Sequence, residues 1–414
     1  YSTKQKQGCE CLKYFIKKVN KISKRKFTKT KYKNRSRCSK RKDKIDPDVV
    51  PLRLTTHLWH SKRFHMITRY KYRLPFSTTC KSYRPTFNCI KNGVVLQDIS
   101  YISPLKIVGE SHHIIELLKH HINDENKISN LKETTALFYE SVDIEESLIG
   151  PVIVSLISIE ENSCICFVWA HPLVVDKLFD ALNFSNTNSE VNVSHLKNVS
   201  RFRMIGPLSI QLMLNTLQPI ENSKADSAWK DLSPFFVSMY DFPPSAMLGV
   251  LIDDKKSKKN YGSLYKSSKH IIHSPDVKPL IDNLLSIDIK EIIMQISEPE
   301  KSIDSFGVPV IAVINNTFNE FNQPSYCDEK LFNGIDIIFP SQFANHFLNC
   351  FIVNGCKVGG LREYMTITRE CFLHSFPDDY PDLEELNQAG MEVNHLSRYI
   401  LLIFLIDKEK GVET

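Results

Sequence analysis

Hydrophobic and polar positions alternate along the chain in two different periods. Between about residues 94 and 203, short β-branched and aromatic runs are separated by segments with a helical spacing of apolar residues. A further apolar run, at Val308–Ile314, predicts a buried strand. The pattern predicts strands at Leu148–Ile159 and Cys164–Trp169 and helices at His112–His121 and Leu173–Leu182. Strands and helices mixed in this way indicate an α+β fold.

Residues 54–73 predict a helix, for which Thr55 or Thr56 is available as the N-cap. At about 100° per residue, its side chains would fall into three groups around the helix, and none of these groups forms a wide face without aromatic, basic or histidine side chains. These groups are Trp59, Met66 and Tyr70; Lys62, Arg69 and Arg73; and His57, His60 and Phe64. We therefore expect this helix to pack against protein on one side and against a phosphate backbone on the other.

Charge divides the chain sharply. Residues 1–91 hold 27 basic and 4 acidic residues, whereas the rest of the chain holds 26 basic and 43 acidic ones. Residues 1–44 lack a stable apolar period, so we expect this basic arm to be largely disordered when free. A cationic arm beside an acidic body is typical of polyanion binding, and a solvated tail that carries only a nuclear import signal is the alternative.

Composition shifts divide the chain into four predicted parts. These are a basic RNA-binding arm at 1–50, a domain at 51–252 with an RNA-binding helix and an α+β core, a polar linker or insertion at 253–305, and a C-terminal module at 306–414. Within the linker we expect a helix at Val277–Ile293. A Gly-Pro turn should lead into another helix within Arg201–Leu217.

Residues with catalytic or metal-binding chemistry do not form a recognisable site in the sequence. Asp253-Asp254 opens a Lys-rich loop, and Asp378-Asp379 lies in a Pro-punctuated stretch that predicts a turn. His57, His60 and His65 have no fourth ligand in a CxxC pair for a closed zinc site. Phosphate-cradling GxxxxGK[ST] and GxGxxG loops are absent from the sequence as well. We therefore expect no catalytic residues, no metal site and no cofactor, as in a binding protein.

The stretch Thr56–Met66, THLWHSKRFHM, resembles a motif of the large processing-of-precursor-RNA (POP) protein subunit shared by eukaryotic ribonuclease P and ribonuclease MRP. The resemblance continues in order along the chain to about residue 361. It includes KSYR at 81–84, LQDISY at 96–101, Gly150-Pro151, WAHP at 169–172, RFR at 201–203, GPLS at 206–209 and VGGL at 358–361. The chain departs from the family at 332–335, FNGI, where a Trp-containing turn is usual, and at 342–345, QFAN, where an aromatic run is usual.

This resemblance implies a scaffold that grips the folded RNA of the particle, while that RNA cleaves precursor tRNA at its 5′ end or, in MRP, precursor ribosomal RNA. Implied partners are the ribonuclease P or MRP RNA and the particle's small protein subunits, in the nucleus and nucleolus. The central domain would be similar to the glycine-cleavage T-protein fold, followed by a family-specific C-terminal module. Residues placed at the RNA by this motif or by the basic arm are Lys24, Arg25, Lys26, Arg35, Arg37, Lys40, Arg41, Lys42, His57, Trp59, His60, Lys62, Arg63, His65, Arg69, Lys81 and Arg84.

Two other functions remain open at this point. A stand-alone enzyme of the aminomethyltransferase kind would need a folate-sized pocket lined by a carboxylate in the middle domain. A generic nucleolar RNA chaperone would bind RNA through residues 1–44 alone. Trp59 has an alternative of its own, as a core residue of its helix.

Overall fold

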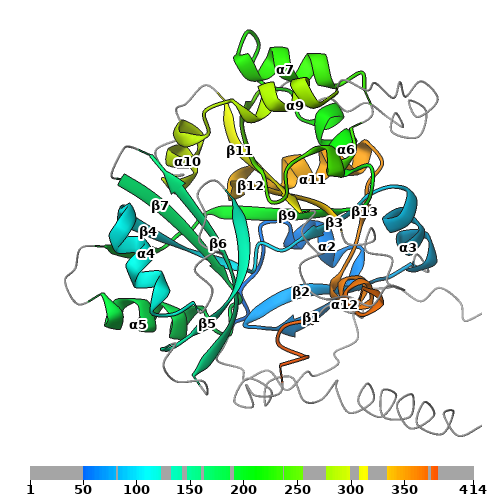
Figure 1. The fold of residues 1–414 in the computed structure, drawn as a ribbon. Helices are drawn as coiled ribbons and strands as arrows, with labels where there is room; N and C mark the ends of the chain where they lie inside the picture. Colours follow the sequence, from blue (N-terminus) through cyan, green and yellow to red (C-terminus); the bar gives the residue numbers. More distant parts are fainter. Residues whose placement is uncertain are drawn as a thin grey trace, which may run out of the picture. The chain divides into compact units, whose positions relative to one another are not determined.

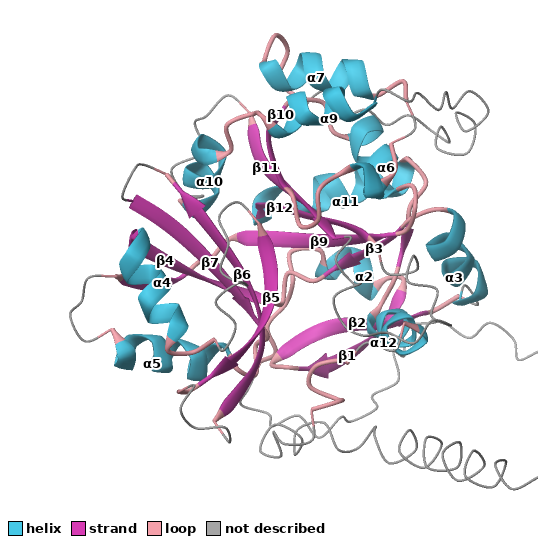
Figure 2. Cartoon of the chain, in the orientation of Figure 1, coloured by secondary structure: helices cyan, strands magenta, loops and turns pink. Residues whose placement is uncertain are grey.

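The computed structural model describes a body built from three β-sheets and the helices around them (Figures 1 and 2). The described residues are 50–80, 83–122, 132–141, 147–159, 163–186, 191–235, 237–254, 277–298, 307–315, 333–371 and 374–380. Among them, no helix is long and apolar enough to cross a membrane. The α+β class predicted from the sequence is confirmed.

The first large sheet has six strands in the order β10-β11-β12-β9-β3-β13. Its strands are β10 (Met247–Ile252), β11 (Val308–Asn315), β12 (Gly334–Pro340), β9 (Val199–Ile205), β3 (Val95–Asp98) and β13 (Lys357–Val358). All neighbours are antiparallel except β13 and β3, which are parallel. Strands from both ends of the described chain therefore share one sheet, although the predicted domain boundaries themselves stay a prediction.

The second large sheet has five antiparallel strands in the order β5-β6-β7-β4-β8. They are β5 (Glu133–Tyr139), β6 (Leu148–Ser158), β7 (Ser163–Ala170), β4 (Ser103–Glu110) and β8 (Asn192–His195). Helices α4 (Ser111–Lys119) and α5 (Val175–Ser185) pack on one face of this sheet through apolar side chains such as Leu118 and Leu178. The strands and helices predicted in this region are confirmed, with ends shifted by a few residues.

The two large sheets pack face to face. Ile165, Phe167 and Trp169 of the five-stranded sheet lie against Ile311 and Ile338 of the six-stranded one, and helix α10 (Lys290–Ser297) joins the same core. Helices α6 (Ser209–Thr216), α7 (Lys224–Leu232), α9 (Val277–Leu285) and α11 (Ala344–Val353) supply apolar side chains to the core on the opposite face of the six-stranded sheet. Strand β11 is buried on both faces, which explains why its sequence is a continuous apolar run.

The sequence prediction of one helix over 277–293 was wrong, because the structure has two helices there. Asp288 lies in the connection between them, and its carboxylate accepts a hydrogen bond of 3.0 Å from the Lys290 backbone N–H, as a residue before a helix often does. Ile281 of α9 enters the core under the six-stranded sheet, whereas Ile293 of α10 enters the core between the two sheets. A single straight helix could not serve both cores.

The helix predicted over 54–73 was also wrong. Only His57–Ser61 is helical (α2), and the chain then forms a hairpin of β1 (Phe64–Arg69) and β2 (Tyr72–Thr78). Tyr70 and Lys71 both have positive φ, 57° and 64°, which is the geometry of a tight two-residue hairpin turn. Such turns usually contain Gly, Asn or Asp, so Tyr70 and Lys71 gave no sequence signal for a turn. Packing against α12 (Leu361–Glu370) stabilises the hairpin in spite of the helical spacing of apolar residues.

A cluster of four charged side chains, of which three are buried and one is partly buried, lies between the two large sheets. Arg201 and Arg203 on β9 both donate to the Asp336 carboxylate on β12, with Arg201 Nε at 2.7 Å and Arg203 Nε at 2.9 Å. Arg201 also donates to Glu133 on β5, at 3.1 Å from Nη1, and its guanidinium lies 4.9 Å from the centre of the Trp169 ring. The two cations and two anions balance, and the cluster joins the two sheets.

Burial opposes the charged form of Asp336, but Arg201 and Arg203 outweigh it and lower the pKa of this carboxyl to about 2. The contribution of Asp336 to stability is therefore fully present above the ordinary Asp value near 4 and is lost only as the pH falls toward 2.

We expect Asp336→Asn to destabilise the fold by about 3–5 kcal/mol, since it leaves the guanidinium groups of Arg201 and Arg203 without their shared carboxylate. Urea denaturation at neutral pH would measure the change in the free energy of unfolding. Asp282→Asn, on an exposed position of α9, is the matched control and should change this energy by less than about 0.5 kcal/mol. Equal stabilities of the two variants would contradict the role of the cluster.

Candidate nucleic-acid interface

The segment 56–66 is anchored to the body by buried polar contacts. The Thr56 hydroxyl donates to the Asp98 carboxylate, and the Ser100 backbone N–H donates to the other oxygen of Asp98 at 3.0 Å. His60 is fully buried, and its Nδ1–H donates to the Thr56 carbonyl at 3.0 Å. Burial lowers the pKa of His60 despite the nearby Asp98, which favours a neutral ring. Thr56 and His60 therefore hold the motif in place from inside.

Sequence elements that lie far apart in the chain meet at strand β3 and the residues after it. Leu96 pairs with Met204 of β9, and the Gln97 side-chain amide donates to the Gly360 carbonyl at 3.0 Å. A Cβ on Gly360 would lie 2.6 Å from the Phe76 carbonyl oxygen. Gly360 thus permits close approach of β2 to the start of α12, which is a packing role.

Exposed basic side chains follow directly on this anchor. Lys62, Arg63 and His65 are exposed where the chain leaves α2 and enters β1. The Arg63 guanidinium lies 4.4 Å from the centre of the Trp59 ring, and its Nη1 donates to the Trp59 carbonyl at 3.1 Å. Arg53 is exposed as well. The structure thus presents a planar cation whose position is fixed by an aromatic ring beneath it.

Trp59 has the core contacts that the sequence left as its alternative role, and its contact with RNA stays a prediction. The ring is half-buried and packs against the core under the six-stranded sheet, although its helix is only one turn and a half long. Because Arg63 lies over the ring, the guanidinium plane is the surface that a base could stack on.

The remaining predicted RNA-binding residues differ in their surroundings. His57 is half-buried, and burial together with Arg53 lowers its pKa. Arg69 forms an ion pair with Asp378 and lies 4.7 Å from the centre of the Tyr70 ring, so its charge is already engaged within the body. Arg84 is exposed near the start of α3 (Tyr83–Asn92). Lys81 and the arm residues Lys24, Arg25, Lys26, Arg35, Arg37, Lys40, Arg41 and Lys42 lie outside the described residues.

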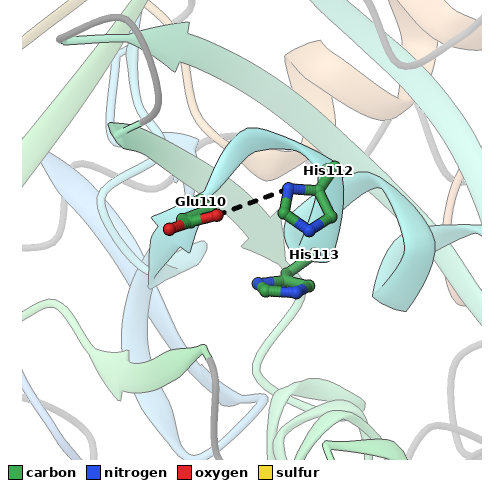
Figure 3. A group of neighbouring side chains, drawn as sticks. All are labelled: Glu110, His112 and His113. Carbon is green, nitrogen blue, oxygen red and sulfur yellow. Dashed lines mark ion pairs between the residues drawn. The ribbon is translucent and has the colours of Figure 1, made fainter.

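The two residues of the Asp378-Asp379 pair have structural partners. Asp378 pairs with Arg69, and the Asp379 carboxylate accepts a hydrogen bond of 2.8 Å from the Ser375 backbone N–H. His57, His60 and His65 do not form a group of metal ligands. Within the described part of the chain, the group of side chains close enough to share an ion is Glu110, His112 and His113 (Figure 3).

His171 lies in a buried cluster of aromatic rings. Ring centres of Tyr70, Phe376 and Tyr101 lie 4.3, 5.0 and 6.1 Å from that of His171, and its Nδ1 accepts a hydrogen bond of 3.3 Å from the Leu173 N–H. Burial, and to a smaller degree Arg69, lower the pKa of His171 to about 3. A neutral packed histidine joins the hairpin, the WAHP segment and residues 374–380.

Two family models match the chain at its two ends. The N-terminal domain of "Ribonucleases P/MRP protein subunit POP1" matches residues 3–110, and the POPLD (NUC188) domain matches residues 334–398. The first match contains the anchored motif and its exposed basic residues, and the second begins at β12. These two matches confirm the resemblance to the POP family that the sequence motif indicated.

Curated relatives with that family name come from several eukaryotes. A Caenorhabditis elegans protein, "Ribonucleases P/MRP protein subunit popl-1", is 22% identical over 86% of this chain and 48% of its own length. The Schizosaccharomyces pombe subunit pop1 is 23% identical over 80% of this chain and 49% of its own, and the human subunit POP1 is 30% identical over 24% and 10%. The chain therefore spans about half of the length of the relatives that it matches most completely.

Among solved structures, the chain is similar to the glycine cleavage system aminomethyltransferase T from Bartonella henselae. The TM-score is 0.46 at 11% identity, and the match covers 79% of this chain and 64% of that one. A likeness of this size carries no conclusion about folate chemistry in this chain.

Thr56→Val should destabilise the fold by about 1–3 kcal/mol, because it keeps the shape of the side chain and leaves one buried oxygen of Asp98 without its donor. Chemical denaturation measures the difference. The neighbouring Thr55 is exposed, so Thr55→Val is the control and should be close to neutral. A neutral Thr56→Val would mean that Asp98 does not anchor the motif.

His171→Asn should weaken the dependence of stability on pH. The folded-state pKa of His171 is about 3 and the ordinary value is 6.5, so the wild type takes up a proton on unfolding and loses stability as the pH falls below 6.5. Asn removes this titration and can still accept the Leu173 N–H. Thermal unfolding between pH 7 and 5 should show a shallower decline in the variant.

The exposed His120 provides the control for this measurement. His120→Asn should retain the wild-type decline. If His171→Asn retained it too, His171 would not be the buried neutral group that the structure indicates.

Proposed function

We propose that this chain is a member of the POP1 family and an RNA-binding scaffold subunit of the ribonuclease P and ribonuclease MRP ribonucleoproteins. In this role it supports 5′ maturation of precursor tRNA and processing of precursor ribosomal RNA. The chain supplies no catalytic residues, and the RNA of the particle performs the cleavage. Its partners are the ribonuclease P RNA, the MRP RNA or both, and the small protein subunits of the same particle, in the nucleus and nucleolus.

The observation that carries this proposal is the position of Arg63. Its guanidinium is exposed, yet the Trp59 ring and carbonyl hold it in one place. A fixed planar guanidinium suits bidentate phosphate binding or stacking on an unpaired base, and it loses little side-chain entropy on binding. Lys62 beside it adds a second positive charge.

The surroundings of this pair support recognition of a folded RNA over sequence-blind binding by a flexible tail. Lys62 and Arg63 follow a helix whose Thr56 and His60 are buried, so the charges are presented from a rigid base. Arg53, His65 and Arg84 add exposed donors from neighbouring segments of the same family-matched region. The basic arm, with its 18 Lys and Arg within residues 1–44, would extend the phosphate contacts.

We expect Lys62→Glu/Arg63→Glu to weaken binding of the particle RNA by about 100-fold or more, since each of the two lost charged contacts contributes about 1.5–3 kcal/mol. The tagged full-length chain would be purified from its native cells, with sequencing of the bound RNA and an assay for precursor-tRNA cleavage. The wild type should enrich one or two structured RNAs of the ribonuclease P or MRP type. Affinity for that RNA should then be measured at several salt concentrations, and its salt dependence should be shallower in the variant.

A charge-matched control is Lys278→Glu/Lys290→Glu, at two exposed positions on α9 and α10. It should bind the RNA nearly as the wild type does. Equal losses in the two variants would show that only net charge matters, as for a generic RNA chaperone. Purification without any such RNA would remove the scaffold proposal.

A further inference from the structure

A group of side chains that could bind a metal ion lies where strand β4 passes into helix α4. Glu110 is the last residue of β4, and His112 and His113 are in the first turn of α4 (Figure 3). One ligand atom of each of the three side chains lies within 4.8 Å of the other two. These residues are part of the five-stranded sheet and its helices, so they belong to a different layer from the candidate RNA-binding residues.

The distances within the group fit metal coordination better than hydrogen bonding. His112 Nδ1 and a Glu110 carboxylate oxygen are 3.5 Å apart, which is longer than the usual 2.7–3.2 Å of an N–H···O hydrogen bond. Two ligand atoms at about 2.0 Å from a tetrahedral zinc ion are separated by about 3.3 Å. The ring centres of His112 and His113 are 3.7 Å apart. Small rotations of the side chains would therefore bring all three ligand atoms onto one ion.

The backbone beneath the group is well held. Glu110 is paired with Ser163 across the β4–β7 ladder, and Ile114, Leu117 and Leu118 of α4 are buried against the sheet. The ligands thus project from a strand end and a helix start whose positions are fixed by the core. Such support reduces the entropy that an ion would otherwise have to overcome on binding.

We propose that Glu110, His112 and His113 form a surface binding site for a borderline-soft divalent metal ion, of which Zn²⁺ is the representative. Two imidazoles and one carboxylate are a donor set that zinc accepts, whereas Mg²⁺ and Ca²⁺ prefer oxygen ligands throughout. The His112 and Glu110 side chains are 66% and 56% exposed, so further coordination positions open to solvent. Water or a donor from another molecule completes the shell there.

Electrostatic contributions at this position both favour and oppose the binding of a cation. The start of a helix carries a partial positive charge, which disfavours a cation. The Glu110 carboxylate offsets that charge, and neutral imidazoles bring none of their own. The balance predicts a site that is occupied reversibly, in contrast to the closed four-ligand sites on which small zinc domains depend for folding.

The test is a titration of the full-length chain with Zn²⁺ against a chromophoric chelator, in the presence of excess Mg²⁺. His112→Gln/His113→Gln should lose one equivalent of bound Zn²⁺ relative to the wild type. Glu110→Gln should weaken that equivalent by about 10- to 100-fold or more, since even loss of a residue that only orients a ligand has an effect of this size. Added Zn²⁺ should raise the thermal midpoint of the wild type and should raise that of the double variant less.

Matched controls lie on the same helix and at its C-cap. Glu116 is exposed on α4 and His120 is exposed at the C-cap, so Glu116→Gln and His120→Gln should bind Zn²⁺ as the wild type does. Circular dichroism would establish that every variant is folded. The proposal is overturned if the His112→Gln/His113→Gln variant binds the same number of zinc ions with the same affinity, or if His120→Gln loses the same equivalent. Neither result would bear on RNA binding, which is measured on other residues.

Discussion

The buried charge cluster around Arg201 is the interaction on which the arrangement of the sheets depends. A guanidinium with no exposed surface would be very unfavourable between two apolar sheet faces, and it is tolerated because Asp336 and Glu133 meet it from neighbouring strands. Glu133 belongs to one large sheet, and Arg201 and Asp336 belong to the other. The pairing therefore selects one way of stacking the sheets, since a slip of one residue in β9 or β12 would separate the charges and expose the apolar side chains.

Strand β9 connects the charge cluster to the candidate interface. Arg201 and Arg203 face the neighbouring sheet, while Phe202 and Met204 on the same strand enter the opposite core. Strand β3 pairs with β9, and Asp98 at its end accepts the Thr56 hydroxyl. The exposed Arg63 is thus three structural steps from the charge cluster: a strand pairing, a buried hydrogen bond and one short helix. The position of Arg63 at the surface therefore depends on contacts in the core.

Sequence patterns predicted the fold class and the strands and helices of the five-stranded sheet, because period-2 and period-3.6 spacing is strong in segments such as Leu148–Ser158. They failed where local signals were misleading. The hairpin turn at Tyr70-Lys71 uses two residues that rarely adopt positive φ, and residues 54–73 have a helical spacing by coincidence. Lys62, Arg63 and His65, which the family resemblance places at the RNA, are exposed, and their contact with RNA stays a prediction. Glu133, which pairs with Arg201 across the sheets, carried no sequence signal at all, since nothing local marks a buried acid on an edge strand.

In three dimensions, the motif that resembles the POP family consists of buried residues that pack against the body and exposed residues that they position. Thr56, His60 and Phe64 are buried, so under the proposed function a change in any of them would alter RNA binding only by shifting the exposed residues. Lys62 and Arg63 interrupt this series at the point where the helix ends and the strand begins, which is where side chains can turn outward. Under the proposed function, this sequence motif combines residues required for packing with residues required for binding. The burial of each side chain distinguishes the packing residues from the exposed ones. Arg69 is therefore a packing residue despite its charge, because it is largely buried and paired with Asp378.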